Sequence, residues 1–218
     1  DFAMFVLDEP DRCIEVAKRT VMSLVPNISR PGESINVRIF NLPRDAKVDI
    51  RNLRADHLRK LVAVDGLARK GTTVRPRMTH ALFRCARCGS EIWVEQPGMI
   101  LKEPLMCNNP ESGCNKQSTR FILDEKASSY IDTQKIEIQE SPEGLRGGAQ
   151  PERITGYVED DIAGVVTAGN RVTLNGILRS AEKNERDKST VFEIYLDVVS
   201  VEFEQHEYDE IVITEDDE

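Results

Sequence analysis

Four of the five cysteines are grouped in the middle of the chain, in a pattern that could bind a metal ion. Cys85 and Cys88 form a Cys-x-x-Cys pair, and after eighteen further residues Cys107 is followed by Cys114. Four thiolates can complete a tetrahedral shell around zinc, and two short loops can each supply two of them. The six residues between Cys107 and Cys114 exceed the usual two to four, but Asn, Pro and Gly there are typical of an irregular loop. We therefore predict a zinc site formed by these four cysteines.

The predicted zinc is structural rather than catalytic. A catalytic zinc keeps an open position and usually has His or carboxylate ligands, and His80 is the only histidine near the cysteines. A zinc enzyme for hydrolysis or transfer is therefore the less favoured alternative. No GxxxxGK[ST] phosphate loop occurs, so we do not expect this chain to bind ATP as a P-loop enzyme. The remaining cysteine, Cys13, is expected to pack as a small apolar residue on a helix.

Charge is unevenly distributed along the chain. The formal net charge is −9, but the segment from Glu202 to Glu218 holds nine acids and no Lys or Arg. The other 29 acids equal the 29 basic residues in number, so the rest of the chain is neutral and carries local basic stretches. No apolar run reaches the length of a membrane span. In an intracellular chain, four grouped cysteines and a fifth that stands alone favour a metal site over disulfides. We expect an intracellular protein without a membrane partner, and we expect the sequence to begin part-way through a longer product.

The predicted elements that must position the cysteines are mainly strands. Residues 9–26 have helical spacing of apolar residues, residues 35–39 alternate as a strand, and residues 54–61 suggest a short helix. Further strands are predicted at 61–68, 72–83, 92–94, 120–123, 130–139, 153–158, 171–178 and 190–203. Strands of this length, separated by turn residues, are typical of a barrel or sandwich. The sequence predicts a helical start followed by a small barrel that a metal-binding segment interrupts.

Two basic stretches could contact nucleic acid. Residues 69–84 contain no acid, and strand alternation places Arg75 and Arg77 on one face, where they could meet a phosphate backbone. An ordinary solvated strand face would show the same pattern. Residues 178–190 read as a long hairpin with a charged tip, in which Lys183, Arg186 and Lys188 alternate with acids. By composition alone that hairpin is a soluble turn.

The chain resembles the minichromosome maintenance (MCM) family of replicative helicases, of archaeal type. The segment YIDTQKIEIQESPE at 130–143 is similar to the family's D-x-Q-x-I-x-I-Q-E-x-P-E stretch, and LRGGAQPER at 145–153 matches the loop that follows it. DDIAG at 160–164 and GNRV at 169–172 resemble the family's DDLV…PGDRV, and FRCARCG at 83–89 resembles the start of its zinc knob. These segments occur in the family's order and together cover about residues 35 to 215.

The resemblance implies a mainly β fold with an α-helical N-terminal bundle and an OB-fold (oligonucleotide/oligosaccharide-binding) barrel that carries an inserted zinc-binding subdomain. Residues 1–60 would be the helical subdomain with a leading strand, lacking its first helix or more. Residues 61–84 and 119–204 would be the two parts of the barrel, with a long hairpin near 179–190, and 85–118 the zinc-binding subdomain. Residues 205–218 would be an acidic linker toward a missing AAA+ ATPase domain.

The resemblance also implies roles for particular residues. The DNA-binding candidates are Arg75, Arg77, Arg84, Arg120, Arg179, Lys183, Arg186 and Lys188. An interdomain communication loop would include Gln139, Glu140, Pro142, Glu143 and Arg146. Structural Zn²⁺ would be the cofactor of this part, whereas ATP and Mg²⁺ would belong to the motor domain alone.

The function that follows is a DNA-encircling, ring-forming domain, itself not an enzyme, of an ATP-dependent DNA helicase. Its expected partners are single- and double-stranded DNA, further copies of itself in a hexamer or double hexamer, and its own C-terminal AAA+ domain. The expected location is the cytoplasm, in association with the nucleoid. The alternative is an assembly scaffold with little DNA affinity of its own.

Overall fold

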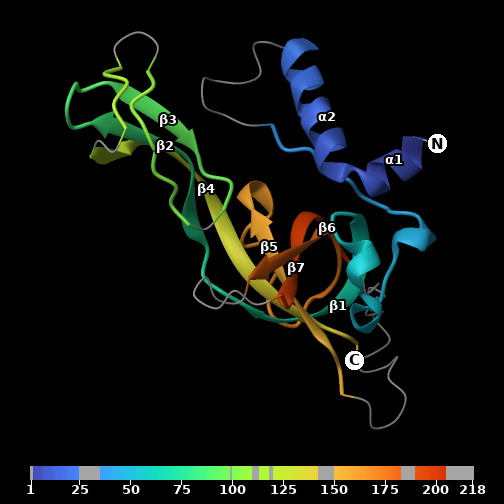
Figure 1. The fold of residues 1–218 in the computed structure, drawn as a ribbon. Coiled ribbons are helices and arrows are strands. Elements are labelled where there is room, and N and C mark those ends of the chain that lie inside the picture. Colours follow the sequence, from blue (N-terminus) through green and yellow to red (C-terminus); the bar gives the residue numbers. More distant parts are fainter. Residues whose placement is uncertain are drawn as a thin grey trace, which may run out of the picture.

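The computed structural model describes residues 2–24, 35–98, 100–109, 113–117, 120–141, 150–182 and 190–204. It contains three parts: a pair of helices, a small barrel and a long β arm (Figure 1). Among the described residues, neither helix is long and apolar enough to cross a membrane.

Five strands close into a barrel. They are β1 (Leu61–Gly71), β4 (Phe121–Gln139), β5 (Arg153–Glu159), β7 (Phe192–Phe203) and β6 (Arg171–Glu182). Each pairs with the next in this order, and β6 returns to β1. All pairs are antiparallel except β5 with β7. A closed five-stranded barrel with this connectivity is an OB fold, which confirms the predicted barrel.

The barrel interior is filled by side chains that alternate along its strands. Ile136 and Ile138 of β4, Val158 of β5, Leu174 of β6 and Leu196 of β7 are at most 1% exposed. Gly156 also faces inward, and a Cβ there would lie 3.1–3.3 Å from three core side chains. Because every second residue points inward, the intervening residues of β4, β5, β6 and β7 form the outer wall.

The arm consists of β2 (Arg75–Cys85), β3 (Glu91–Glu95) and the first half of β4. Strand β4 therefore belongs to both the arm and the barrel (Figure 1). Within the arm β4 bulges at residues 125–128, where the Ser128 hydroxyl accepts from the Leu82 N–H at 3.0 Å and donates to the Asp124 carbonyl at 2.7 Å. The sequence predicted two strands in this region because the bulge interrupts the alternation. The range 61–84 assigned to the barrel holds one barrel strand, β1, and most of an arm strand, β2.

The N-terminal part contains helices α1 (Phe2–Asp8) and α2 (Pro10–Leu24). The described residues thus show two short helices where the family resemblance implied a bundle. Val6, Leu7 and Ile14 pack on a cluster formed by the outer side of β1, β6 and β7. Cys13 is half-buried on α2, as expected for a packing residue.

Two local predictions between the helices and the barrel are wrong. Residues 35–39 form no strand, because this segment lies across the barrel and bonds to it through side chains. Arg38 Nη1 donates to the Val199 carbonyl at 2.8 Å, and the Ser200 hydroxyl donates to the Ile39 carbonyl. Residues 54–61 form only a 3-10 turn, η3 (Ala55–His57), before β1 begins; η1 (Arg44–Ala46) and η2 (Ile50–Asn52) precede it.

Candidate metal centre and nucleic-acid face

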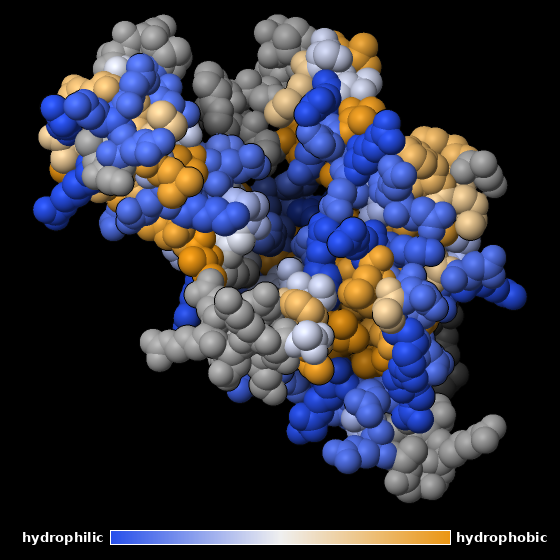
Figure 2. Space-filling model, in the orientation of Figure 1, coloured by the Kyte–Doolittle hydropathy of each residue, from blue (hydrophilic) through white to orange (hydrophobic). Residues whose placement is uncertain are grey.

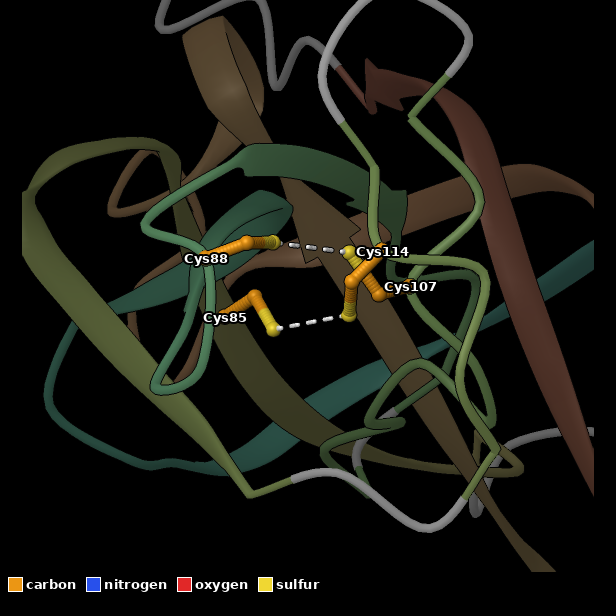
Figure 3. Close-up of side chains that lie close together, drawn as sticks. All are labelled: Cys85, Cys88, Cys107 and Cys114. Carbon is orange, nitrogen blue, oxygen red and sulfur yellow. Dashed lines mark hydrogen bonds between the residues drawn. The ribbon is translucent and has the colours of Figure 1, made fainter.

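The four predicted cysteines come together where β2 ends, at the far end of the arm (Figure 3). All four Sγ atoms lie within 4.8 Å of one another. Cys85 Sγ is 3.9 Å from Cys114 Sγ, and Cys88 Sγ is 3.5 Å from Cys107 Sγ. Ligands at zinc–sulfur distances of about 2.3 Å in a tetrahedron stand about 3.8 Å apart. The cluster therefore fits a metal ion such as zinc.

The first cysteine pair is held by a tight turn after β2. The Gly89 N–H donates to the Cys85 carbonyl at 2.8 Å, and the Cys85 N–H donates to the Ser90 carbonyl at 3.0 Å. Gly89 has a φ of 75°, which favours glycine. The turn directs both sulfurs to the same side.

The second pair is brought together by a loop that closes on itself. The Asn115 N–H donates to the Cys107 carbonyl at 3.0 Å, and the Gly113 N–H donates to the Asn109 carbonyl at 2.9 Å. A Cβ at Gly113 would lie 2.5 Å from that carbonyl oxygen, so the loop has no room for a side chain there. The unusual six-residue spacing is thus compatible with one site.

Hydrogen bonding and burial act in opposite directions on the thiols. The Ser90 hydroxyl and N–H lower the pKa of Cys88 to about 6, whereas burial raises the pKa of Cys107 to about 11. A metal ion binds thiolates and would supply the charge that keeps the buried Cys107 deprotonated. Among the described residues, Cys85, Ile92 and Cys107 form the buried cluster here, with Val94, Cys114 and Phe121 packed against it. So small a core indicates that the metal would be a structural element.

The predicted DNA-binding arginines fall into two groups. Arg75 and Arg120 are exposed and make no ion pair with another described residue. Arg77 pairs with Glu159 at 2.9 Å, and Arg84 pairs with Glu91 at 3.2 Å and Asp124 at 3.1 Å. Lys183, Arg186 and Lys188 lie outside the described residues, although β6 and β7 do form the predicted hairpin up to Glu182 and Phe192.

Arg179 links the helices to the barrel. Its guanidinium donates to both carboxylate oxygens of Asp11 on α2, at 2.6 and 2.8 Å, and to Asp197 on β7 at 3.2 and 3.3 Å. The hydrogen bonds to Asp11, followed by the field of Asp197, raise the pKa of Arg179. In this arrangement Arg179 is occupied by protein carboxylates.

The base of the predicted communication loop is closed by Glu140. Its N–H donates to the Glu152 carbonyl at 3.1 Å, and its carboxylate accepts from the Glu152 N–H at 3.1 Å. Gln139 is the last residue of β4, and its side chain accepts from Arg69 at 3.3 Å. Pro142, Glu143 and Arg146 lie outside the described residues.

Aromatic residues on the outer wall of the barrel were not among the predicted site residues. Tyr157 of β5 and Tyr195 of β7 are half-buried, with ring centroids 5.3 Å apart and planes at 90°. Burial, followed by the charge of Asp197, raises the pKa of Tyr195. Tyr157 lies between the buried Gly156 and Val158, and Tyr195 precedes the buried Leu196, which was the signal available in the sequence.

A hydrophilic groove of about 480 Å³ separates the arm from the helices (Figure 2). Lys18 of α2, His80 of β2 and Tyr130 of β4 line it, together with Arg38 and Arg77. The Nε atoms of both arginines are buried and have no hydrogen-bond partner among the described residues. The groove thus marks the junction at which the arm, helices and barrel meet.

Comparisons with known proteins agree on one family. The model of the MCM OB domain matches residues 49–182. The chain is similar to the minichromosome maintenance protein MCM of Saccharolobus solfataricus, with 33% identity over 205 residues, covering 91% of this chain and 29% of that protein. It is also similar to the DNA replication licensing factor mcm4 of Schizosaccharomyces pombe, with 27% identity covering 88% of this chain and 22% of that protein. A solved N-terminal domain of an archaeal MCM matches with a TM-score of 0.79 and 32% identity, over 94% of this chain and 80% of that one. The chain thus spans less than a third of these two curated relatives.

Proposed function

Since this chain belongs to the MCM family and has the OB fold of its N-terminal domain, we propose that it is the DNA-binding and ring-forming part of a replicative helicase. The observation that carries the proposal is the closed OB barrel with an exposed cation, Arg75, at the start of the arm. The complete protein would be an ATP-dependent DNA helicase, with ATP and Mg²⁺ bound by a motor domain. The protein would act in the cytoplasm on nucleoid DNA.

The binding is electrostatic and independent of sequence. A hexameric ring presents each cation six times around one DNA, so modest contacts in each subunit add together. Arg75 and Arg120 would contact phosphates directly, and the hairpin cations Lys183, Arg186 and Lys188 would reach into the channel. Arg77, Arg84 and Arg179 would contribute only when DNA phosphates displace their carboxylate partners.

Zinc would serve this function from the tip of the arm, held by Cys85, Cys88, Cys107 and Cys114. It supplies four bonds that fix two loops where the apolar core is small. The loop that contains Gln139, Glu140, Pro142, Glu143 and Arg146 would transmit DNA binding to the AAA+ domain.

An assembly scaffold is the second candidate function. The observation that favours it is the apolar surface of the arm, where Trp93, Leu105 and Ile122 are 55%, 90% and 56% exposed. Large exposed apolar side chains on one part of a molecule can form a contact surface between proteins. On this alternative the arms join rings, and DNA affinity is low.

DNA affinity and oligomeric state, measured on the same samples, test both candidates. We expect fluorescently labelled DNA to bind, with an affinity that falls steeply as salt rises because counterions are released. The double variant Arg75→Ala/Arg120→Ala should bind more weakly and show a smaller salt slope, while light scattering finds the parental oligomer. Lys102→Ala, which removes a cation near the arm, is the matched control and should bind as the parent does. Unchanged binding by the double variant would favour the scaffold, and no binding at low salt would exclude the DNA-binding function.

A further inference from the structure

The four cysteines at the tip of the arm differ in how accessible they are. Cys85 is 2% exposed and Cys107 is 0% exposed, whereas Cys114 is half-buried and Cys88 is exposed. Oxidants react more readily with an exposed thiolate than with a buried one, because susceptibility follows thiolate character and access. Cys88 is therefore the residue of this cluster with which a dissolved oxidant reacts first.

The sulfur contacts within the cluster join cysteines of different segments (Figure 3). Cys88 Sγ, in the turn after β2, is 3.5 Å from Cys107 Sγ in the loop that follows β3. Cys85 Sγ, at the end of β2, is 3.9 Å from Cys114 Sγ in the same loop. A disulfide bond is about 2 Å long, so each pair needs a further approach of about 1.5 to 2 Å. Each of these two contacts can thus become a bond between the two segments.

Both segments are also closed by backbone hydrogen bonds of their own. The Gly89 N–H donates to the Cys85 carbonyl at 2.8 Å, and the Asn115 N–H donates to the Cys107 carbonyl at 3.0 Å. Disulfides between the segments would therefore connect two loops that already hold their shapes, as four metal–sulfur bonds would. Disulfides within the segments, from Cys85 to Cys88 and from Cys107 to Cys114, would leave the two loops without a covalent connection.

From this accessibility and these contacts we propose that the cluster is a redox-sensitive site, which peroxide converts from a metal-binding form to a form with the disulfides Cys88–Cys107 and Cys85–Cys114. The inference rests on the proposed zinc centre and not on the proposed DNA binding. Its consequence is that the arm tip has a second closed state, in which two disulfides connect the loops after the metal has been lost.

The conversion consumes two peroxide molecules per chain. The Cys88 thiolate attacks one peroxide oxygen, the O–O bond breaks and hydroxide leaves, so that Cys88 becomes a sulfenic acid. The Cys107 thiolate then attacks the Cys88 sulfur, the S–S bond forms, the S–O bond breaks and a second hydroxide leaves. Two thiolates have then lost two electrons, which the peroxide has gained. Since two thiolates do not complete a zinc shell, the metal is released, and Cys85 and Cys114 react with a second peroxide in the same way.

Proteolysis of the oxidised protein can identify which cysteines are joined. Arg87 lies inside the first cysteine pair and Glu111 inside the second, so trypsin and a glutamate-specific protease together separate all four cysteines. They then lie on the peptides 85–87, 88–91, 103–111 and 112–116. After peroxide treatment of the zinc-loaded protein and digestion without reductant, mass spectrometry should find 88–91 joined to 103–111 and 85–87 joined to 112–116.

Zinc release and thiol counting measure the extent of the same reaction. Peroxide should release one zinc ion per chain to a chromophoric indicator, and the thiols titrated after denaturation should fall from five to one, which is Cys13. Reductant and added zinc should restore the starting state. Cys13→Ser, which removes the cysteine outside the cluster, is the matched control and should release zinc at the parental rate. A reagent that traps sulfenic acids during a short peroxide pulse should label Cys88 before the other three.

The outcomes separate the redox proposal from the zinc centre. Disulfides within the segments, sulfinic acids without disulfides, or zinc that peroxide does not release would overturn the redox proposal and leave the zinc centre intact. A purified protein that binds no added zinc would overturn both. None of these results bears on DNA binding, which the salt-dependent affinity measurements test separately.

Discussion

Arg51 and Glu140 form a bidentate ion pair where the segment that precedes β1 meets the end of β4. Arg51 Nη2 is 2.6 Å from Glu140 Oε2, Arg51 Nε is 2.9 Å from Oε1, and the Arg51 N–H donates to Oε1 at 3.0 Å. The Glu140 side chain is only 9% exposed. Hydrogen bonding to Arg51 holds the pKa of Glu140 at about 2, although burial opposes this shift. The family resemblance gave Glu140 a place in a communication loop, and the structure shows what fixes it.

This pair should make stability depend on pH in the acid range. The pKa of Glu140 is lower in the folded protein than its usual 4.5, so its contribution is complete above that value and is lost as pH falls toward 2. Glu140→Gln should cost about 3 kcal/mol of unfolding free energy at pH 7 and less at pH 3. Urea unfolding at both pH values measures this. Glu125→Gln, at an exposed bulge position, is the control, and an equal loss at both pH values would contradict the explanation.

Removing the metal should unfold the arm while the barrel remains folded. The buried cluster at the arm tip is small, whereas the barrel core is separate from it. Trp93 is the only tryptophan of the chain and lies on β3 in the arm, so its fluorescence reports on this part. A chelator should change the emission of Trp93, and zinc should restore it, while far-ultraviolet circular dichroism keeps its strand signal. If the chelator leaves the emission of Trp93 unchanged, a structural metal at these cysteines is excluded.

Gly113→Ala should weaken metal binding by distorting the second cysteine loop. The added Cβ would lie 2.5 Å from the Asn109 carbonyl oxygen and 2.7 Å from its nitrogen, both backbone atoms that cannot move without shifting Cys107 or Cys114. Competition with a chromophoric chelator should show a zinc affinity at least about tenfold lower. Gly98→Ala meets nothing within 4 Å and should bind zinc as the parent does. Equal affinities for the two variants would show that the loop tolerates the displacement.

Asp11→Asn should loosen helix α2. The helix buries only Pro10 fully, so the bidentate bond from Arg179 is a large part of its attachment. We expect a loss of about 1 kcal/mol and faster amide hydrogen exchange in α2. Because Arg179 would then be released toward phosphates, DNA affinity should rise slightly. Glu15→Gln, which removes the exposed ion pair with Arg19, serves as the control. If Asp11→Asn and Glu15→Gln show the same amide exchange rates in α2, the bond from Arg179 does not attach the helix.

The strands and the metal ligands could be predicted because their signals are local. Alternation along β5 reflects one wall facing the core, the other barrel strands were predicted from β-rich runs between turn residues, and the spacing of Cys85 and Cys88 reflects a single turn. Cys107 and Cys114 were assigned despite their spacing, and the sulfur positions support that choice.

The features that could not be predicted from the sequence depend on contacts between residues that lie far apart in the chain. Residues 35–39 alternate like a strand, yet the alternation comes from lying against β7 rather than from pairing with another strand. Arg77 and Arg179 read as free cations, but Glu159 and Asp11 lie 82 and 168 residues away. Tyr157 and Tyr195 meet only because β5 and β7 run side by side.

The shared strand β4 makes the arm a removable module. β2 and β4 enter the arm opposite one another at Arg75 and Thr133, and every barrel pairing of β4 lies at or after Thr133. Two antiparallel strands that face each other at one position can be joined by a two-residue hairpin turn. Excising the intervening segment would sever no barrel ladder, so a trimmed barrel, or one carrying a grafted insertion in place of the arm, is accessible to protein engineering.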